Sequence, residues 1–516
     1  MKLALISVYN KTGIIEFAKG LELLNYEIIA SGGTYELLKK NHIIRLKKVE
    51  QITDFPEIMN GRVKTLHPKI YGGLLADRNN IEHMNHAKEN RIGLIDLVVC
   101  NLYPFQETVS RAGVTEQEAR ENIDIGGSAM IRAAAKNCQY VYAVTDPGDY
   151  QKVLGSLRAD NQKFRKELAQ QAFAYTAKYD EAISNYFSGN QNLDLHFKKI
   201  SELRYGENPH QPAALYRRDD LKTKVHQPAG VINAELLHGK KLSYNNILDA
   251  DSALALIQEF SQPAAAVIKH TNPCGLAIGP DIASAFIKAY QADSQSAFGG
   301  IIVLNRQCNK EIAAKINQVF AEAVLAPDFE PAALKILEQK KNIRLIKLDS
   351  LSPLSQLSVK SVKSTDKEYR FIKGGVLEQE EDNHRLLAAA LRCVTKKKPT
   401  AAIIKDMLFA WPILKHVKSN AVILVKNGVT VGIGAGQMSR VDSVALALIK
   451  AGKKSRGAVA ASDSFFPFRD SVDKLAKSGV KCIIQQGGSI KDDEVITAAN
   501  EQGLIMVFTG VRAFKH

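Results

Sequence analysis

The first part of the chain alternates short apolar runs with amphipathic stretches, and this alternation most constrains the fold. Runs rich in β-branched residues, such as Leu3 to Val8 and Tyr26 to Ala30, are followed by stretches with helical spacing, such as Gly13 to Leu24 and Thr34 to Lys40. Strands that alternate with helices favour a parallel sheet covered by helices. We therefore expect an α/β fold up to about Ser188, beginning with a strand rather than a secretory signal.

The remaining residues are also expected to be α/β, after a polar segment without a clear period. This segment, Gly189 to Lys199, predicts domains at 1–190 and 200–516. A stretch rich in Lys, Ser and Asp predicts a join between two subdomains around 340–370. Asn427-Gly428 between apolar runs predicts a tight hairpin, and Thr395 to Ala421 is predicted to be helical. No internal repeat of solenoid length is visible in the sequence.

Composition and charge exclude several classes of protein. The 516 residues are 45% apolar and carry 69 Lys+Arg against 54 Asp+Glu, a net charge of +15. This excludes disorder, and no run approaches the ~18–20 apolar residues of a membrane span. The six cysteines are scattered singly, which favours a reducing, cytoplasmic location. Basic residues are not interleaved with aromatics, so we expect anionic small molecules as partners rather than nucleic acid, or charge that serves solubility alone.

Three loops in the first part have the chemistry of an anion site. Ser31 to Thr34 follows an apolar run and begins a helix, where backbone N–H groups can bind phosphate. Gly61 to Pro68 is rich in Arg, Lys, Thr and His, and Asp124 to Ser128 enters a helix. The alternatives without a ligand are, in the same order, a strand-to-helix turn with a Thr cap, a solvated basic loop and an Asp helix cap. Because Asp96 to Pro104 is a strand that ends in polar residues, we expect all four segments to converge beyond the carboxyl ends of the strands.

The second part holds a candidate base and two misleading patterns. Lys269 and His270 end an apolar run before a Pro/Gly turn, and a histidine there can move protons near neutral pH or be merely structural. Pro273-Cys274 lacks the second cysteine of P-C-x-x-C, so we expect no catalytic zinc. Gly432 to Gly436 reads G-x-G-x-G, so we expect no NAD. Ser462 to Asp470 combines Phe with Arg and Asp, which suits a flat heterocycle or simply the core.

The motifs closely resemble, in order and along essentially the whole chain, one family of de novo purine biosynthesis. It is the bifunctional phosphoribosylaminoimidazolecarboxamide formyltransferase and IMP cyclohydrolase family. The segments that carry the resemblance are Gly61 to Pro68, Asp124 to Lys136, Arg204 to Gln211, Lys269 to Gly275, Gly432 to Arg440 and Phe465 to Asp470. A zinc nucleoside deaminase and a nucleotide-binding regulator without catalysis are the competing hypotheses.

The resemblance implies both architecture and chemistry. It implies a methylglyoxal-synthase-like parallel-sheet domain that acts as IMP cyclohydrolase, followed by a formyltransferase region of two cytidine-deaminase-like subdomains without zinc. The formyltransferase would move a formyl group from 10-formyltetrahydrofolate to 5-aminoimidazole-4-carboxamide ribonucleotide, and the product would close to IMP with loss of water. It also implies a cytoplasmic homodimer that needs neither a catalytic metal nor NAD.

The resemblance also implies residue roles. The catalytic residues of the cyclohydrolase would be Lys136, Lys64, Tyr103 and Asp124, and its nucleotide contacts Lys11, Ser31, Gly32, Gly33, Thr34, Arg62, Thr65, Asn101 and Ile125. In the formyltransferase, His270 would be the base, with Lys269 and Asn420 beside it. The nucleotide would contact Arg204, Tyr205, Gly299, Arg440, Phe465 and Arg512, and the folate Asp470, Gly487 and Gly488. Tyr9-Asn10 stands where the family has Ser-Asp, and Glu322 where some members have Asp.

Overall fold

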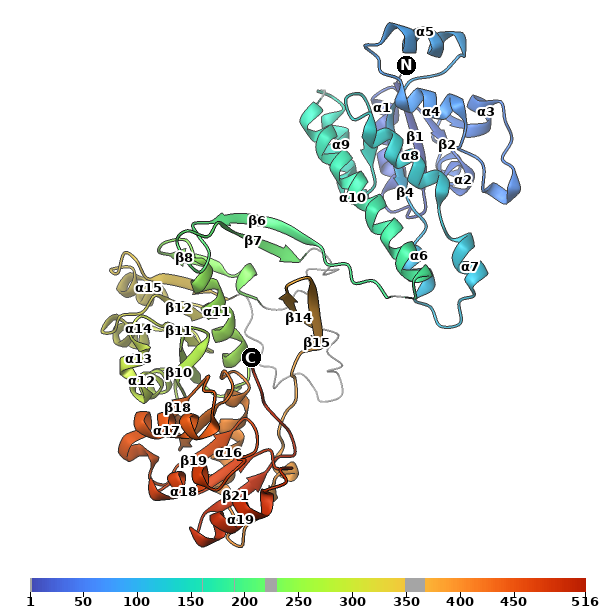
Figure 1. The fold of residues 1–516 in the computed structure, drawn as a ribbon. Helices are drawn as coiled ribbons and strands as arrows, with labels where there is room; N and C mark the ends of the chain where they lie inside the picture. The colour runs from blue at the N-terminus through green and yellow to red at the C-terminus, as the bar shows by residue number, and fades with distance from the viewer. Residues whose placement is uncertain (1, 160, 190, 219–229, 349–366) are drawn as a thin grey trace. The chain divides into compact units, whose positions relative to one another are not determined.

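The chain divides into two compact units, Met1–Asp194 and Leu195–His516 (Figure 1). The computed structural model describes residues 2–159, 161–189, 191–218, 230–348 and 367–516. Within these residues no helix is long and apolar enough to cross a membrane. Most of the predicted join at 340–370 lies outside the described residues.

Unit 1 is a parallel five-stranded sheet with helices on both faces. The strand order is β3-β2-β1-β4-β5, and every pairing is parallel. The strands are β1 (Lys2–Val8), β2 (Tyr26–Ala30), β3 (Leu46–Lys48), β4 (Ile95–Asn101) and β5 (Tyr142–Val144). The helices are α1 (Ile14–Leu23), α2 (Gly32–Lys40), α3 (Val49–Thr53), α4 (Pro68–Leu75), α5 (Ile81–Glu89), α6 (Phe105–Val109), α7 (Glu116–Glu121), α8 (Ile125–Lys136), α9 (Tyr150–Ser156) and α10 (Gln162–Phe187).

Burial on both faces explains the apolar strands of unit 1. In β1, Ala4 and Ile6 pack into one core with α1 and α9, whereas Leu5 packs into the other with α4 and α8. Because both faces of a parallel sheet are covered, its strands are continuously apolar. The predicted parallel α/β fold of the first part is confirmed.

Unit 2 is built around one mixed sheet of twelve strands in the order β16-β21-β20-β19-β17-β18-β10-β9-β11-β12-β13-β8. Its first strands are β8 (Glu235–His238), β9 (Ala264–Lys269), β10 (Asn272–Ile278), β11 (Ile301–Leu304), β12 (Ala323–Ala326) and β13 (Arg344–Lys347). The others are β16 (Arg392–Cys393), β17 (Val422–Lys426), β18 (Val429–Gly434), β19 (Val459–Ser462), β20 (Cys482–Gln485) and β21 (Ile505–Phe508). Two separate exposed hairpins are β6 (Phe197–Leu203) with β7 (Ala213–Arg218), and β14 (Lys367–Ile372) with β15 (Gly375–Glu380).

The helices show that unit 2 repeats one succession of elements. The first half contains α11 (Tyr244–Ile257), α12 (Ile282–Ala292), α13 (Ser294–Ala297), α14 (Lys310–Asn317) and α15 (Pro331–Leu337), and the second α16 (Ala401–Leu414), α17 (Arg440–Ala451), α18 (Asp470–Lys477) and α19 (Asp492–Glu501). In each half a helix precedes a hairpin (β9–β10, β17–β18), which three further strands follow, separated by helices. The halves join between β10 and β18, and α11 and α16 share one core. The two subdomains therefore share one continuous sheet.

Two local predictions had different outcomes. The hairpin at Asn427-Gly428 is confirmed, because both residues have positive φ, 53° and 69°, between paired β17 and β18. The helix predicted at Thr395 to Ala421 is too long, since α16 covers only 401–414. Thr400 caps its start by accepting from the Ile403 N–H at 3.4 Å, and Pro412, which cannot donate a backbone hydrogen bond, lies in its last turn.

Two candidate active sites

The candidate site of unit 1 lies where the strand order reverses, between β1 and β4. The Asn10 N–H donates to Asn101 Oδ1 at 2.7 Å, which joins the loop after β1 to the end of β4. The Val8 N–H donates to Thr34 Oγ1 at 3.2 Å, and that hydroxyl donates to the Val8 carbonyl at 3.2 Å. Three loops that follow neighbouring strands therefore meet at one edge of the sheet.

The loop of residues 61–68 closes the same site. Lys64 Nζ lies 3.9 Å from the point that a Cβ on Gly32 would occupy, and Thr65 Oγ1 lies 3.0 Å from that of Gly126. Asp124 caps α8 by accepting from the Gly127 N–H at 2.7 Å. The pKa of Asp124 is raised because burial outweighs two opposing effects, the hydrogen bond from the Gly127 N–H and the positive charge of Lys64. The four segments thus converge as predicted, with Lys64 and Asp124 at their meeting point.

Lys136 is not at this meeting point. It is the last residue of the twelve-residue helix α8, whereas Asp124 caps its start. At 1.5 Å per residue the two backbones are roughly 18 Å apart. The predicted catalytic Lys136 therefore lies at the opposite end of α8 from Asp124.

The other predicted contacts of unit 1 differ in what their side chains do. Asn101 and Thr34 hold backbone groups, as described above, and Lys11 Nζ lies 3.4 Å from the Val8 and Tyr9 carbonyl oxygens. Arg62 forms an ion pair with Glu121. Tyr103 is 41% exposed with its ring edge-on to Tyr9, and Ile125 is 62% exposed.

In unit 2 the candidate base lies in the turn of a hairpin. Lys269 pairs with Asn272, so His270 and Thr271 form a two-residue turn, with φ of 52° and 59°. The left-handed conformation costs non-glycine residues about 1–2 kcal/mol each, and it is rarest for β-branched residues. The prediction of a Pro/Gly turn after His270 is wrong, because Pro273 to Gly275 belong to β10. Gly275 is needed there for packing, since a Cβ would lie 2.1 Å from the Ala289 carbonyl oxygen of α12.

The side chain of Lys269 points toward another predicted contact. Its Nζ donates to the Phe298 carbonyl at 2.8 Å, directly before Gly299. Gly299 has a φ of 75°, and its N–H donates to the Phe320 carbonyl at 2.9 Å. The structure therefore brings Lys269 and Gly299 together.

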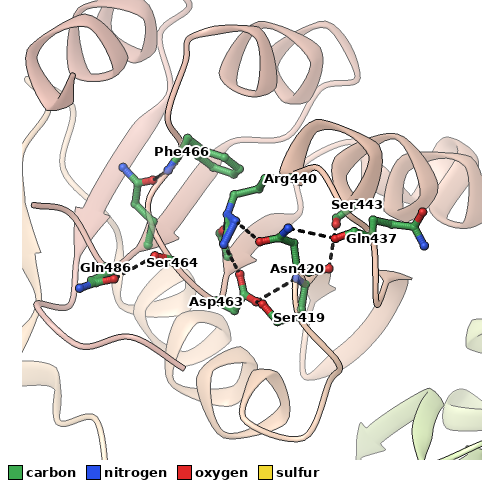
Figure 2. Close-up of polar contacts among 12 residues, drawn as sticks. Ser419, Asn420, Gln437, Arg440, Ser443, Asp463, Ser464, Phe466 and Gln486 are labelled. Carbon is green, nitrogen blue, oxygen red and sulfur yellow. Dashed lines mark hydrogen bonds and ion pairs between the residues drawn. The ribbon is translucent and has the colours of Figure 1, made fainter. Parts of the chain in front are cut away.

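Asn420 lies in the segment between α16 and β17, within a network of hydrogen bonds (Figure 2). Its Oδ1 accepts from Arg440 Nη1 at 2.9 Å, and its Nδ2 donates to the carbonyls of Gln437 and Met438 at 2.9 and 3.1 Å. Ser443 Oγ donates to its backbone carbonyl at 2.8 Å. The orientation of the Asn420 amide is thus held from both ends.

Arg440 serves this network rather than presenting its guanidinium to solvent. It is 8% exposed, and besides Asn420 its nitrogens donate to Ser462 Oγ at 3.1 Å and Asp463 Oδ1 at 2.7 Å. Burial raises the pKa of Asp463, opposed by the charge of Arg440 and by hydrogen bonds from Ser419 and Ala421. No sequence motif points to Asp463 as a site residue, although its place directly after buried β19 is a usable signal.

The predicted folate positions lie beside this network. The Phe466 N–H donates to Gln485 Oε1 at 2.7 Å, and Ser464 Oγ lies 2.9 Å from Gln486 Oε1. These bonds hold the segment of Phe465 and Asp470 against the turn of Gly487 and Gly488, whose φ values are 77° and 90°. Two carboxyl ends of neighbouring strands, β19 and β20, meet here.

The remaining predicted contacts of unit 2 are Arg512, Arg204 and Tyr205. The ring of Phe514 lies 4.5 Å from the Arg512 guanidinium and 5.9 Å from that of Arg440, which brings Arg512 to the network. Arg204 stacks over Tyr205 at 5.4 Å, in the loop after β6. Among the described contacts, none joins that pair to His270.

One further hydrogen bond connects the two candidate catalytic segments. Asn272 Oδ1 accepts from the Lys418 N–H at 3.0 Å, so the His270 turn lies beside the segment that leads to Asn420. Within the described ranges, no group of three or more His, Cys, Asp or Glu is arranged to hold a metal ion. The structure thus brings the segments of His270 and Asn420 side by side.

Comparison with known proteins identifies the family. The model of the AICARFT/IMPCHase bienzyme matches residues 134–450, and that of the MGS-like domain matches residues 13–129. The chain belongs to the AICARFT/IMPCHase bienzyme family. It is therefore a bifunctional enzyme of purine biosynthesis, a formyltransferase and cyclohydrolase with an MGS-like N-terminal domain, as the sequence resemblance predicted.

Relatives match over the full length. "Bifunctional purine biosynthesis protein PurH" of Thermoanaerobacter sp. (strain X514) is 49% identical, and the protein of the same name from Bacillus cytotoxicus is 47% identical, each over 100% of both chains. The crystal structure of ForH is 32% identical, covers 37% of this chain and 100% of its own, and has a TM-score of 0.35.

Proposed function

We propose that the two activities are divided between the units, with the cyclohydrolase in residues 1–190 and the formyltransferase in residues 200–516. The formyl donor is 10-formyltetrahydrofolate, the acceptor is 5-aminoimidazole-4-carboxamide ribonucleotide, and the final product is IMP. The observation that carries the proposal is the strained turn that presents His270, with Lys269 next to it and the Asn420 segment alongside.

Formyl transfer requires a base because the aromatic amine is a poor nucleophile. Its lone pair is delocalised into the ring, so His270 accepts the amine proton as the N–C bond to the formyl carbon forms. When the intermediate collapses, the bond from that carbon to the folate nitrogen breaks and the nitrogen takes up a proton. Lys269 uses one N–H on the Phe298 carbonyl, which leaves two for the oxyanion or the departing nitrogen.

The Asn420 amide can take part without leaving its network. Its Oδ1 accepts one hydrogen bond from Arg440, and a carbonyl oxygen has a second lone pair. That lone pair can accept from the substrate amine. The nucleotide is held by Arg204, Tyr205, Gly299, Phe465 and Arg512, and the folate by Asp470, Gly487 and Gly488.

Ring closure in unit 1 demands less of the protein, because the attacking carboxamide nitrogen and the formyl carbon belong to one molecule. Lys64 and Asp124, with Tyr103, are suited to move the protons as water is lost. The phosphate and ribose contact Lys11, Ser31 to Thr34, Arg62, Thr65, Asn101 and Ile125. Because Lys136 lies at the opposite end of α8 from Asp124, we propose that it acts in the site of the second subunit of the homodimer.

The experiment is a pair of variants with both reactions assayed separately. His270→Ala is expected to abolish formyl transfer and leave cyclisation of supplied formylated nucleotide intact, whereas Lys64→Ala is expected to do the reverse. Loss of both reactions in either folded variant would refute two separate sites. The proposal that the enzyme is a cytoplasmic homodimer without metal or NAD is tested by sedimentation, cell fractionation and activity after exhaustive chelation.

A further inference from the structure

Two hairpins at the centre of the unit 2 sheet each have a two-residue turn, but the residues in the turns differ. In β17–β18 the turn is Asn427-Gly428, the pair that adopts positive φ most readily. In β9–β10 it is His270-Thr271, which has the same two-residue length between paired strands and φ of 52° and 59°. Because a β-branched residue such as Thr271 disfavours this conformation, groups outside the turn must hold it.

An aspartate on the preceding helix contacts each turn. Asp406, the sixth residue of α16, accepts from the Gly428 N–H at 2.8 Å and from the Asn427 N–H at 2.9 Å. Asp249, the sixth residue of α11, accepts from the Thr271 N–H at 2.7 Å. The carboxylates thus occupy the same place in the two halves and bind the same backbone position.

The turn of the first half has one additional restraint. Asn272 Nδ2 donates to the His270 carbonyl at 3.1 Å, while its Oδ1 accepts from the Lys418 N–H. The carbonyl of the turn's first residue and the N–H of its second are therefore both fixed by side chains. These two groups belong to one peptide unit, which begins at the Cα that carries the imidazole.

We propose that Asp249 is a positioning residue of the formyltransferase site. Its carboxylate holds the His270-Thr271 turn in the left-handed conformation, so that the imidazole meets the substrate amine in one orientation. Asp249 acts through the Thr271 backbone and does not touch the reacting atoms. The inference rests on the proposed function, in which His270 is the base.

The test compares Asp249→Ala with Asp406→Ala in the full-length enzyme. D249A removes the carboxylate that accepts from the Thr271 N–H. We expect this to lower kcat for formyl transfer by about tenfold to a hundredfold, while the KM for the ribonucleotide stays within about twofold of the wild-type value. D406A removes two equivalent bonds from a turn whose residues keep positive φ on their own, so kcat is expected to stay at the wild-type value. Cyclisation serves as the internal control in both.

A conservative variant separates position from charge. Asp249→Asn still offers Oδ1 to the Thr271 N–H and is expected to recover most of the activity lost in D249A, with an unchanged pH profile. Asp249→Glu keeps the charge but moves the oxygen, so it is expected to lower kcat, and it replaces D249A if that variant does not fold. Any of three results would overturn the inference. The first is a wild-type kcat in D249A or D249E, the second is an equal loss of kcat in D249A and D406A, and the third is a kcat in D249N as low as that in D249A.

His270→Ala in the same assay distinguishes the two levels of failure. If H270A retains formyl transfer, the proposed base is wrong and the inference fails with it. If H270A is inactive but D249A and D249E are fully active, the proposed function stands and the positioning role alone is refuted.

Discussion

Breaking the buried ion pair of Arg440 and Asp463 is expected to destabilise unit 2 and disturb Asn420. Asp463 is 0% exposed and accepts from Arg440 at 2.7 Å, from Ser419 Oγ at 2.6 Å and from the Ala421 N–H at 3.0 Å. Asp463→Ala leaves a buried guanidinium without its counter-charge, which costs about 3–5 kcal/mol. The unpaired Ala421 N–H adds about 1–3 kcal/mol.

A double-mutant cycle isolates the pair. Arg440→Met leaves the Asp463 carboxylate unpaired and should cost a similar amount, whereas the double variant D463A/R440M contains neither charge. We therefore expect the double variant to be more stable, by at least about 2 kcal/mol, than the sum of the two single-variant losses in free energy of unfolding would give.

The assay is urea unfolding followed by tryptophan fluorescence. The chain has one tryptophan, Trp411, which is 1% exposed in α16, so the signal reports unit 2 alone. Losses that add within about 0.5 kcal/mol would refute the coupling. In variants that stay folded, kcat for formyl transfer should fall because Arg440 no longer fixes Asn420, while cyclisation by unit 1 is unchanged.

Three further predictions concern other parts of the molecule. If Lys136 acts across a dimer, mixing inactive Lys64→Ala and Lys136→Ala subunits should restore about a quarter of the cyclisation rate, whereas no recovery would place both residues in one chain's site. The side chain of His416 is 14% exposed, its Nε2 lies 3.3 Å from Glu259 Oε1, and its Nδ1 has no hydrogen-bond partner among the described residues. Burial lowers the pKa of His416 below 6.5, so its contribution to the free energy of unfolding is fully present above pH 6.5 and is lost as the pH falls through the folded pKa. His416→Gln should reduce this pH dependence in unfolding curves followed by Trp411 fluorescence. An unchanged dependence on pH would contradict the prediction. A Cβ at Gly434 would lie 1.9 Å from the Ser443 carbonyl oxygen, so Gly434→Ala should destabilise unit 2 by about 1–3 kcal/mol or more in the same assay, and a neutral effect would show that α17 can shift.

Several features followed from local sequence pattern. The alternating runs predicted the parallel sheet of unit 1, because apolar β-branched strands and amphipathic helices bury complementary faces. The same rule placed the polar ends of β1, β2 and β4 at one edge, where Lys64 and Asp124 are found. Asn427-Gly428 predicted its hairpin, because those residues prefer the required dihedral angles.

Other features could not be read from the sequence. The two halves of unit 2 share a succession of elements without a visible sequence repeat, because many residue combinations can satisfy the same pattern of burial. The burial of the Arg440 guanidinium against Asp463 is one of these features, since no local pattern reveals it.

The sequence by itself determined the α/β class, the alternation of strands and helices at the start of unit 1 and which residue types are available for chemistry, because these depend on periodicity and composition. Only the tertiary structure decided how those residues are oriented. His270 lies in a turn that its own residues disfavour, and the contact that supports it comes from Asp249, on a different element. Local preference cannot predict such a turn, because its stability depends on a hydrogen bond that exists only once helix and hairpin have packed together.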